Sequence, residues 1–344
     1  MRAGTMRTSN RSTLTVAALA AVVALVSGCG ETGQGPQQSA KEGGKIICLM
    51  PKLVGIPYFE ASKTGAEEAA KELKVELTYN GPTEGKAALQ VEMIEQLIQR
   101  QCGAISVAAN DPDALAPAMK KAKEAGIATG AWDADVKKDA RDVFVNQATF
   151  EAVGKQLVDI MSKQTGEKGD FLVVTGSLTA PNQRAWLEEM KAHMADKYPD
   201  MKVAAVEPGE ENLQKGIDVT RDYLKANPDT AGVFGITSVA LPGAAEAVEQ
   251  AGLDGKVKVT GLTTPNEMKD YIKKGTVEEF VLWNPVDLGY LAVHVAKAQL
   301  DKKLPKSGKF KAGRLGEVEV VKPDEVLLGP PIVFNKDNIG EYDF

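Results

Sequence analysis

The chain has 344 residues and carries 47 acidic against 41 basic side chains, for a formal net charge of −6. This acidic balance argues against nucleic acid as a partner, because binding to phosphates needs a basic surface. The length exceeds what a single hydrophobic core usually serves, so two domains are expected.

The first 28 residues have the parts of a secretory signal peptide. Three arginines precede an apolar run over residues 14–26, and two small residues then come directly before Cys29. The apolar run is too short for a membrane span. Small residues before a cysteine resemble a bacterial lipobox, which implies cleavage before Cys29 and a diacylglyceryl group on its sulfur. A plain signal peptide cut nearby, with Cys29 incidental, is the alternative.

Residues 29–44 predict a lipid anchor followed by a flexible tether, because they are rich in Gly, Gln, Glu and Ser. Removing residues 1–28 takes away three arginines and no acid, which lowers the formal charge from −6 to −9. Two more cysteines, Cys48 and Cys102, lie in or directly before predicted strands. Two buried thiols are the preferred interpretation, and a disulfide between neighbouring strands is the alternative.

The first unit after the tether is a strand, a loop and a helix. Residues 45–50 form a short apolar run typical of a strand covered on both faces, and residues 61–73 have helical spacing. The loop between them lies at the carboxyl end of a parallel strand, where α/β proteins bind small ligands. It carries Lys52, Tyr58 and Phe59, which suit a polyhydroxylated ligand, and it lacks the glycine-rich phosphate-binding motifs. An ordinary connection with a solvated lysine is the alternative.

Strands and helices then alternate in two sets. In the first set we expect strands at 75–79, 103–109, 127–131 and 143–145, and helices at 86–101 and 115–125. In the second set we expect strands at 171–175, 203–206, 232–236 and 258–262, and helices at 150–164, 185–197, 214–226, 242–251 and 267–274. Such alternation predicts parallel sheets, and two sets imply two similar α/β domains. A strand at 279–283, a helix at 288–300 and strands at 316–321 and 332–334 follow, and they can return to the first domain.

Polar and aromatic side chains follow many of the predicted strands. Together with the first loop they give the candidate ligand-binding set Lys52, Tyr58, Phe59, Asp111, Trp132, Asp133, Asn182, Gln183, Ser238, Trp283 and Asn284. Charged and amide groups can bond sugar hydroxyls, while aromatic faces cover the C–H faces of the ring. For Trp132 and Trp283, core packing is the alternative. Asp133 is the strongest candidate because a carboxylate at a strand end needs a partner.

The sequence contains little that would support catalysis. His193 lies in a charged stretch and is expected to be solvated, and His294 lies in an apolar stretch and is expected in the core. We find no nucleophile elbow, zinc-protease motif or cluster of Cys and His, so no catalytic residue, metal or cofactor is predicted. Paired acids among Asp111, Asp133 and Asp135 could serve a glycosidase, but sugar binding explains them without a reaction.

Seven segments spread over nearly the whole mature chain carry a family resemblance. They are PKLVG at 51–55, YNGPTE at 79–84, AWDAD at 131–135, NQ at 146–147, TPNEM at 264–268, GTVEEFVLWN at 275–284 and VFNKDNIGEYDF at 333–344. With them the chain resembles type I periplasmic sugar-binding proteins, the receptor components of ABC importers, and in particular the branch with L-rhamnose and autoinducer-2 receptors.

The resemblance implies two Rossmann-like α/β domains with parallel sheets, joined by a hinge of three crossover strands and holding the ligand between them. Asn146-Gln147 and the strand that ends at Trp283 fall where crossovers are expected. We assign residues 45–146 with 285–304 to the N-terminal domain, and residues 147–284 with 305–344 to the C-terminal domain.

The same resemblance assigns roles to individual residues. Autoinducer-2 receptors bind with a lysine, an aspartate and a glutamine that match Lys52, Asp133 and Gln183. They carry aspartate, proline and alanine at three further positions, where this chain has Asn182, Ile236 and Ser238. Rhamnose-type receptors look closer at the pair Asn182-Gln183, and a 6-deoxyhexose also offers a methyl group that Phe59 or a tryptophan can cover.

The resemblance implies a monomeric, extracytoplasmic lipoprotein that meets the membrane only through its lipid. Its expected function is to capture a monosaccharide, with an L-rhamnose-like 6-deoxyhexose favoured, and to deliver it to the permease of an ABC transporter. A receptor that takes up or senses autoinducer-2 is the alternative, and a secreted sugar-modifying enzyme is less favoured. Repressors of the same fold carry an N-terminal helix-turn-helix where this chain has a signal peptide, which argues against a nucleic-acid partner.

Overall fold

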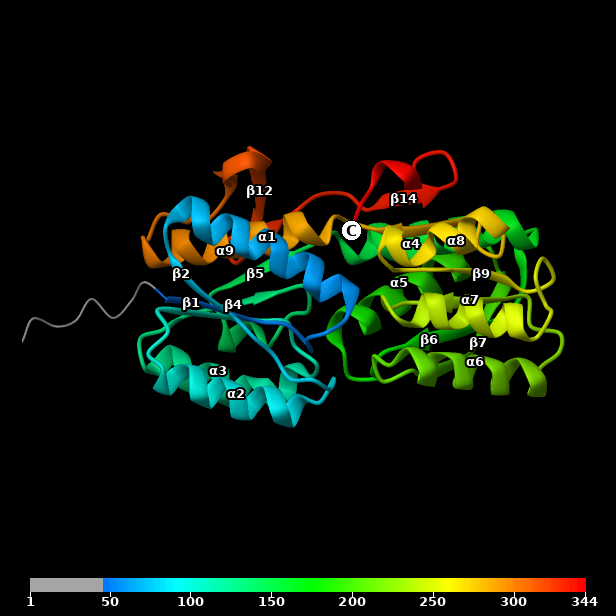
Figure 1. Cartoon of the computed structure of the whole chain (residues 1–344), viewed down its shortest axis with the longest axis horizontal. Helices are drawn as coiled ribbons and strands as arrows, with labels where there is room; N and C mark the ends of the chain where they lie inside the picture. Colours follow the sequence, from blue (N-terminus) through cyan, green and yellow to red (C-terminus); the bar gives the residue numbers. More distant parts are fainter. Residues whose placement is uncertain (1–45) are drawn as a thin grey trace, which may run out of the picture. The chain divides into compact units, whose positions relative to one another are not determined.

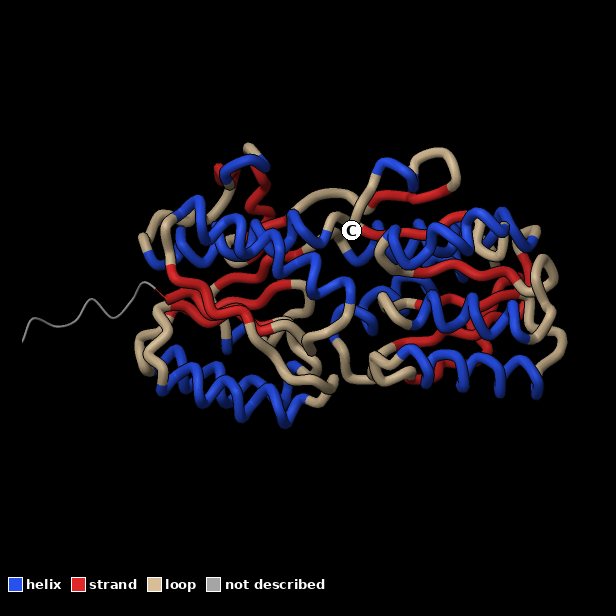
Figure 2. The backbone as a smooth tube through the Cα atoms, viewed as in Figure 1, coloured by secondary structure: helices blue, strands red, loops and turns tan. Residues whose placement is uncertain are grey.

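The computed structural model describes residues 46–344, and the predicted signal peptide, Cys29 and the tether lie outside these residues. The described chain forms two lobes, each with strands in the middle and helices on both sides (Figures 1 and 2). The expected α/β class with mainly parallel sheets is confirmed. Between residues 46 and 344, no helix is both long enough and apolar enough to cross a bilayer.

The first lobe is built on an eight-stranded sheet with the order β11-β12-β13-β5-β4-β3-β1-β2. Its strands are β1 (Ile46–Met50), β2 (Glu76–Tyr79), β3 (Ala104–Val107), β4 (Ala128–Trp132), β5 (Val143–Asn146), β11 (Gly308–Lys311), β12 (Glu317–Lys322) and β13 (Glu325–Leu327). Its helices are α1 (Pro57–Leu73), α2 (Ala87–Gln99), α3 (Pro112–Glu124) and α9 (Pro285–Leu300). The strands β1 to β5 are parallel, with α1 and α9 packed on one face and α2 and α3 on the other (Figure 1).

The second lobe contains a parallel sheet with the order β7-β6-β8-β9. Its strands are β6 (Lys168–Thr175), β7 (Asp200–Pro208), β8 (Gly232–Gly235) and β9 (Lys258–Gly261), and the antiparallel pair β10 (Glu279–Leu282) and β14 (Ile332–Asn335) lies beside β9. Its helices are α4 (Phe150–Thr165), α5 (Pro181–Lys197), α6 (Leu213–Ala226), α7 (Ala240–Gln250) and α8 (Pro265–Lys274). Short 3₁₀ turns occur at Lys138–Ala140, Gly313–Leu315 and Ile339–Glu341.

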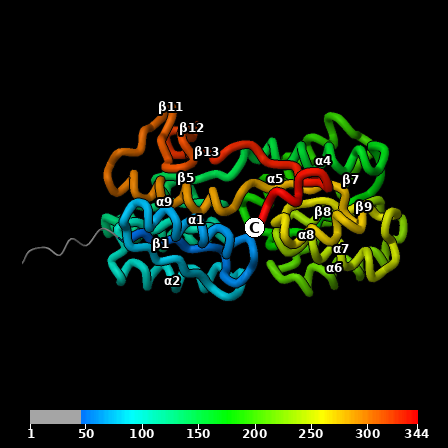
Figure 3. The backbone as a smooth tube through the Cα atoms, turned by 45° about the horizontal axis from the view of Figure 1, so that its top comes forward, coloured from blue at the N-terminus to red at the C-terminus, as the bar shows by residue number. Residues whose placement is uncertain are grey.

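The strands β11 to β13 belong to the first lobe, which corrects the assignment of this part of residues 305–344 to the C-terminal domain, whereas β14 does lie in the second lobe. β13 pairs in parallel with β5, and β12 and β11 extend the sheet beyond it (Figure 3). Arg141 reinforces this edge, because its guanidinium donates to the backbone oxygen and the carboxylate of Asp324, both at 2.9 Å. The physical reason is that an uncovered edge strand offers unpaired backbone groups, and the returning chain satisfies those of β5.

Several helices begin two to four residues earlier than the sequence pattern predicts. Five of these helices have proline as their first residue, at Pro57, Pro112, Pro181, Pro265 and Pro285, whereas α7 begins early at Ala240. Proline suits this position because its φ is already helical and its missing N–H has no partner to lose there. Tyr58, Phe59, Asn182 and Gln183 therefore lie in first helical turns rather than in loops. The helix backbone therefore sets the directions in which these four side chains point.

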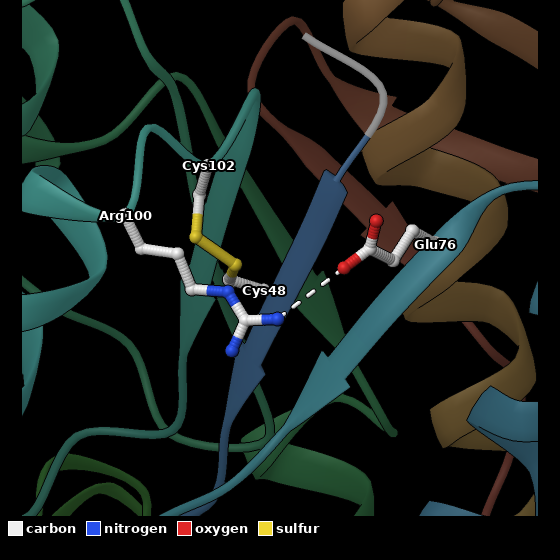
Figure 4. Close-up of a disulfide and its surroundings, with 4 residues drawn as sticks. All are labelled: Cys48, Glu76, Arg100 and Cys102. Atoms are coloured by element: carbon white, nitrogen blue, oxygen red, sulfur yellow. Dashed lines mark hydrogen bonds and ion pairs between the residues drawn. A yellow bond between two sulfur atoms is a disulfide. The ribbon is translucent and has the colours of Figure 1, made fainter. Parts of the chain in front are cut away.

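Cys48 and Cys102 form a disulfide, so the preferred interpretation of two buried thiols is wrong. Cys48 lies in β1 and Cys102 lies directly before the neighbouring strand β3, which brings their Cα atoms to 6.1 Å (Figure 4). The Arg100–Glu76 ion pair, 3.3 Å long and exposed, lies nearby. Strand pairing, which the sequence leaves open, decides that the two cysteines meet.

Candidate functional site

A cavity of about 40 Å³ lies between the carboxyl edges of the two sheets. It is lined from the first lobe by Lys52, Ile56, Tyr58, Phe59 and Asp133, and from the second by Asn182, Gln183, Trp186, Glu211, Ile236, Thr237, Ser238, Leu262, Leu282 and Trp283. Such a volume holds a few water molecules, whereas pockets for small organic molecules begin at about 300 Å³. A ligand of sugar size therefore has to displace the contacts that now close the cavity.

Lys52 and Asn182 join the two lobes across this cavity. The ammonium of Lys52 donates to Oδ1 of Asn182 at 3.0 Å and lies 4.0 Å from Oδ2 of Asp133. The Asn182 amide in turn donates to the backbone oxygen of Asp133 at 3.4 Å. Lys52 and Asp133 are each only 3% exposed, so each charge depends on the other and on hydrogen bonds. These polar groups are satisfied by one another, and a hydroxylated ligand can take over the same bonds.

Asp133 is oriented by a chain of aromatic donors. The Tyr58 hydroxyl donates to Oδ1 of Asp133 at 2.7 Å, and it accepts from Nε1 of Trp283 at 2.9 Å. Burial raises the pKa of Tyr58 well above its ordinary value, and the charge of Asp133 raises it further, so the phenol stays protonated and donates. Burial also raises the pKa of Asp133, while the charge of Lys52 and the Tyr58 hydrogen bond oppose that rise.

Gln183 lines the cavity, but its polar atoms are engaged within the second lobe. Its Oε1 accepts from Oγ1 of Thr175 at 2.7 Å and from the backbone N–H groups of Gly176 and Ser177 at 3.0 and 3.1 Å. Its Nε2 donates to Oε1 of Glu211 at 2.8 Å. Gln183 therefore holds the turn after β6 and orients Glu211.

Gln90 plays the corresponding part in the first lobe, although the sequence reading did not single it out. Its Nε2 donates to the backbone oxygens of Pro51 and Ala108, at 3.1 and 2.8 Å, and its Oε1 accepts from the N–H of Asn110 at 2.9 Å. The Asn110 side chain then donates to the backbone oxygen of Lys52 at 2.8 Å. A glutamine on the buried face of α2 was the signal in the sequence that could have identified Gln90. Gln90 fixes the ends of β1 and β3 through these hydrogen bonds.

A family model described as "Periplasmic binding protein domain" matches residues 47–304. The chain belongs to the periplasmic binding protein family. A curated relative, the D-allose-binding periplasmic protein of Escherichia coli (strain K12), is 26% identical over 247 residues, which cover 69% of this chain and 79% of the relative.

Two solved structures are also similar to the chain. A solute binding protein of an ABC transporter from Clostridium phytofermentas, with bound L-rhamnose, has a TM-score of 0.84 at 30% identity and covers 87% of this chain and 98% of its own. LsrB from Clostridium saccharobutylicum, in complex with AI-2, has a TM-score of 0.83 at 27% identity and covers 87% and 100%. The two TM-scores are nearly equal, so the fold does not discriminate between the ligands L-rhamnose and AI-2.

Within this periplasmic binding protein, eight predicted site residues line the cavity and three do not. Those in the lining are Lys52, Tyr58, Phe59, Asp133, Asn182, Gln183, Ser238 and Trp283. Asp111 and Asn284 instead cap the N-termini of α3 and α9, where their side chains accept hydrogen bonds from backbone N–H groups. Trp132 is completely buried in the core, with its ring 5.8 Å from that of Phe59. Burial of Trp132 behind the site fits the core-packing alternative.

The structure adds lining residues that the sequence reading did not propose. Trp186 follows Asn182 by one helical turn on α5, and its ring lies 5.8 Å from that of Trp283. Its spacing from Asn182 was a usable signal once α5 is known to start at Pro181. Glu211, in the loop between β7 and α6, carried no signal, because one acid among neighbouring acids in a loop looks like solvated surface.

The two histidines lie away from the cavity lining. His193 is only 9% exposed, with Nε2 2.7 Å from Oδ1 of Asp159, and Tyr198 donates to the same oxygen at 2.9 Å. The expectation of a solvated His193 is therefore wrong, because the packing of α4 against α5 covers this part of the helix. His294 is buried beside Tyr290, as its apolar neighbours predicted.

Proposed function

We propose that this periplasmic binding protein is an extracytoplasmic, lipid-anchored receptor that captures a monosaccharide between its lobes and delivers it to the permease of an ABC importer. The observation that carries the proposal is the composition of the cavity. A lysine, a carboxylate and an amide share the cavity lining with the aromatic side chains of Tyr58, Phe59 and Trp283. Such a pairing of polar groups with aromatic faces is what a sugar ring requires. Relatives named for D-allose and D-ribose support the class of ligand.

The favoured ligand is an L-rhamnose-like 6-deoxyhexose. The cavity lining includes the apolar side chains of Trp186, Ile236, Leu262 and Leu282, and contact with such side chains suits a methyl group. Ile236 and Ser238 stand where the resembled autoinducer-2 receptors carry proline and alanine. Asn182 stands in place of their aspartate, and its Oδ1 accepts from Lys52. A related structure holds L-rhamnose.

Ligand capture in this proposal exchanges partners within the cleft. Three connections run between the lobes, from β5 to α4, from β10 to α9 and from β13 to β14. When the lobes separate on these connections, Lys52 and Asn182 part. When they close again, ligand hydroxyls bridge Lys52, Asp133 and Asn182, so that no buried charge loses its hydrogen bonds.

The test is a calorimetric titration of the Cys29→Ser protein with L-rhamnose, other aldoses and autoinducer-2. We expect L-rhamnose to bind tightest and mass spectrometry to recover it unchanged after long incubation. Failure of every sugar to bind would contradict the proposed function. A reaction product would favour the sugar-modifying enzyme.

Autoinducer-2 is the second candidate ligand, because Lys52, Asp133 and Gln183 match the residues of its receptors and a related structure holds AI-2. Asn182→Asp restores the aspartate of those receptors. A gain in autoinducer-2 affinity in this variant, from a wild type that prefers L-rhamnose, would show that position 182 discriminates between the two ligands.

A further inference from the structure

Glu211 brings a second carboxylate to the cavity. It precedes α6 in the second lobe, is 9% exposed, and is held by the 2.8 Å hydrogen bond from Nε2 of Gln183. The same residue also lines a groove of about 800 Å³, so Glu211 borders both spaces.

The backbone around Glu211 is arranged at some cost to hold it there. Glu210 and Glu211 have φ values of +55° and +51°, a left-handed conformation that side chains other than glycine seldom adopt. A Cβ on Gly176 would lie 2.1 Å from Oε1 of Glu211, so only glycine leaves room for the carboxylate. On the opposite lobe, a Cβ on Gly85 would lie 3.5 Å from Cγ of Glu211. Glu211 therefore lies where the two lobes meet.

The cavity lining carries an excess of negative charge. Its charged residues are Lys52, Asp133 and Glu211, which leave one net negative charge. The positive charge of Lys52 is already shared with Asp133, 4.0 Å away, and with Oδ1 of Asn182. Among the described residues no basic side chain lies within ion-pair distance of Glu211, so a negative group on a ligand would be repelled by its carboxylate in a buried site.

We propose that Glu211 is a ligand-contacting residue that accepts hydrogen bonds from sugar hydroxyls and makes the site selective for uncharged sugars over sugar acids and sugar phosphates. The inference rests on the proposed function and names the substrate class of the same site. Gln183 is a positioning residue that acts through Glu211, since its own oxygen is occupied by Thr175, Gly176 and Ser177.

The first experiment compares neutral sugars with their charged counterparts. The Cys29→Ser protein is titrated with L-rhamnose, D-galactose and D-ribose, and then with D-galacturonate and D-ribose 5-phosphate. Each charged compound is expected to bind at least ~100-fold more weakly than the tightest neutral sugar. A charged compound that binds as tightly as the best neutral sugar would overturn the inference.

The second experiment changes the carboxylate. Glu211→Ala is expected to weaken the tightest neutral sugar by about 10- to 100-fold, because its hydroxyls lose a charged acceptor. Glu211→Gln keeps the shape of the side chain but removes its charge. This variant is therefore expected to show a smaller difference in affinity between neutral sugars and charged compounds. The matched control is Glu188→Ala, which changes an exposed acid on α5 outside the cavity lining and should leave affinity unaltered. Circular dichroism and melting curves establish that each variant is folded.

The outcomes separate this inference from the proposed function. If a sugar binds the wild type and Glu211→Ala binds it equally well, the role of Glu211 is wrong and the proposed function stands. If no sugar binds the wild type, both are wrong. For Gln183, the double variant Gln183→Ala/Glu211→Ala should bind no more weakly than Glu211→Ala alone. Additive losses would contradict a role exerted through Glu211.

Discussion

Asp133 takes its surroundings from parts of the chain that lie far apart in sequence. Its carboxylate accepts a hydrogen bond from the Tyr58 hydroxyl, and its Oδ2 lies 4.0 Å from Nζ of Lys52. The backbone of Asp133 has a φ of +60° directly after β4. In the proposed complex the carboxylate accepts hydrogen bonds from two ligand hydroxyls. Asp133→Ala should therefore cost about 2 to 4 kcal/mol of binding free energy, or about 30- to 1,000-fold in affinity, measured by calorimetry.

Asp111→Ala is the matched control for Asp133→Ala. It removes an aspartate from another strand end of the same lobe, where the carboxylate caps α3 and does not reach the cavity. Loss of the cap should cost about 1 kcal/mol of stability and leave ligand affinity unchanged. Unaltered affinity in folded Asp133→Ala would place the binding site elsewhere.

His294 predicts a pH dependence of stability. Burial lowers the pKa of His294, and the positive charge of Arg314, which lies 4.4 Å over the Tyr290 ring, lowers it further. The negative charge of Glu72, whose Oε1 lies 3.9 Å from Nε2 of His294, opposes this decrease. Above its ordinary pKa of about 6.5 the imidazole is neutral in both states. As pH falls below that value the unfolded chain takes up a proton first, so the folded state loses stability.

The measurement compares melting temperatures of the wild type and His294→Phe at pH 8 and pH 5.5. Phenylalanine keeps the stacking on Tyr290, whose ring centroid lies 4.5 Å from that of His294, but cannot be protonated. We expect the drop in melting temperature between the two pH values to be smaller in the variant. An equal drop would mean that His294 does not contribute to the pH dependence.

At the scale of elements, α1 and α9 touch through two glycines. A Cβ on Gly65 would lie 1.8 Å from the backbone oxygen of Val286, and one on Gly289 equally close to that of Ser62. In a free helix, Gly→Ala stabilises by about 0.5 to 1 kcal/mol. Here the clash is with backbone and cannot be relieved by a rotamer change. Gly65→Ala and Gly289→Ala should therefore each destabilise the fold by about 1 to 3 kcal/mol in urea denaturation.

Gly329→Ala serves as the control for the helix pair. A Cβ at this position in the connection between β13 and β14 meets no atom within 4 Å. Its effect should stay within about 0.5 kcal/mol. If Gly65→Ala destabilised the fold no more than this control, the inferred close approach of α1 and α9 would be contradicted.

The disulfide between β1 and the start of β3 also acts at this scale. It closes a loop over a sequence separation of 54, and the entropy of the unfolded chain should fall accordingly. The double variant Cys48→Ala/Cys102→Ala should lose about 2 to 4 kcal/mol of stability by denaturant titration. As a direct check, the Cys29→Ser protein unfolded without reductant should show no free thiol. Two titratable thiols would refute the pairing.

At the scale of the whole molecule, the anchor should be separable from ligand binding. The lipobox-like residues and Cys29 precede the described lobes, whereas the cavity is built from residues 52–283. Cys29→Ser should move the protein from the membrane fraction to the soluble fraction while its sugar affinity stays the same. Retention of the variant on membranes would contradict lipid anchoring.

Much of the candidate site could be anticipated because it follows a local rule. Lys52, Asp133 and Ser238 each follow a buried parallel strand, and the carboxyl ends of such strands gather at one edge. Glu211 also follows a parallel strand, β7, but it is one of several acids in that loop, and only the hydrogen bond from Gln183 and the gap at Gly176 distinguish it. Asp111 obeyed the rule but turned toward its own helix, since the orphan N–H groups of α3 were nearer than the cavity.

The sequence by itself determined the alternation of strands and helices, the parallel sheets and the family, because apolar periodicity and motif residues are local properties of the chain. Tertiary structure alone decided that β11 to β13 complete the first sheet, that Cys48 meets Cys102, and that Glu211 shares a cavity with Lys52. Each of these depends on which distant segments pack together. Pairing of sheet edges and burial of charge are settled by the free energy of the whole fold, which no local pattern encodes.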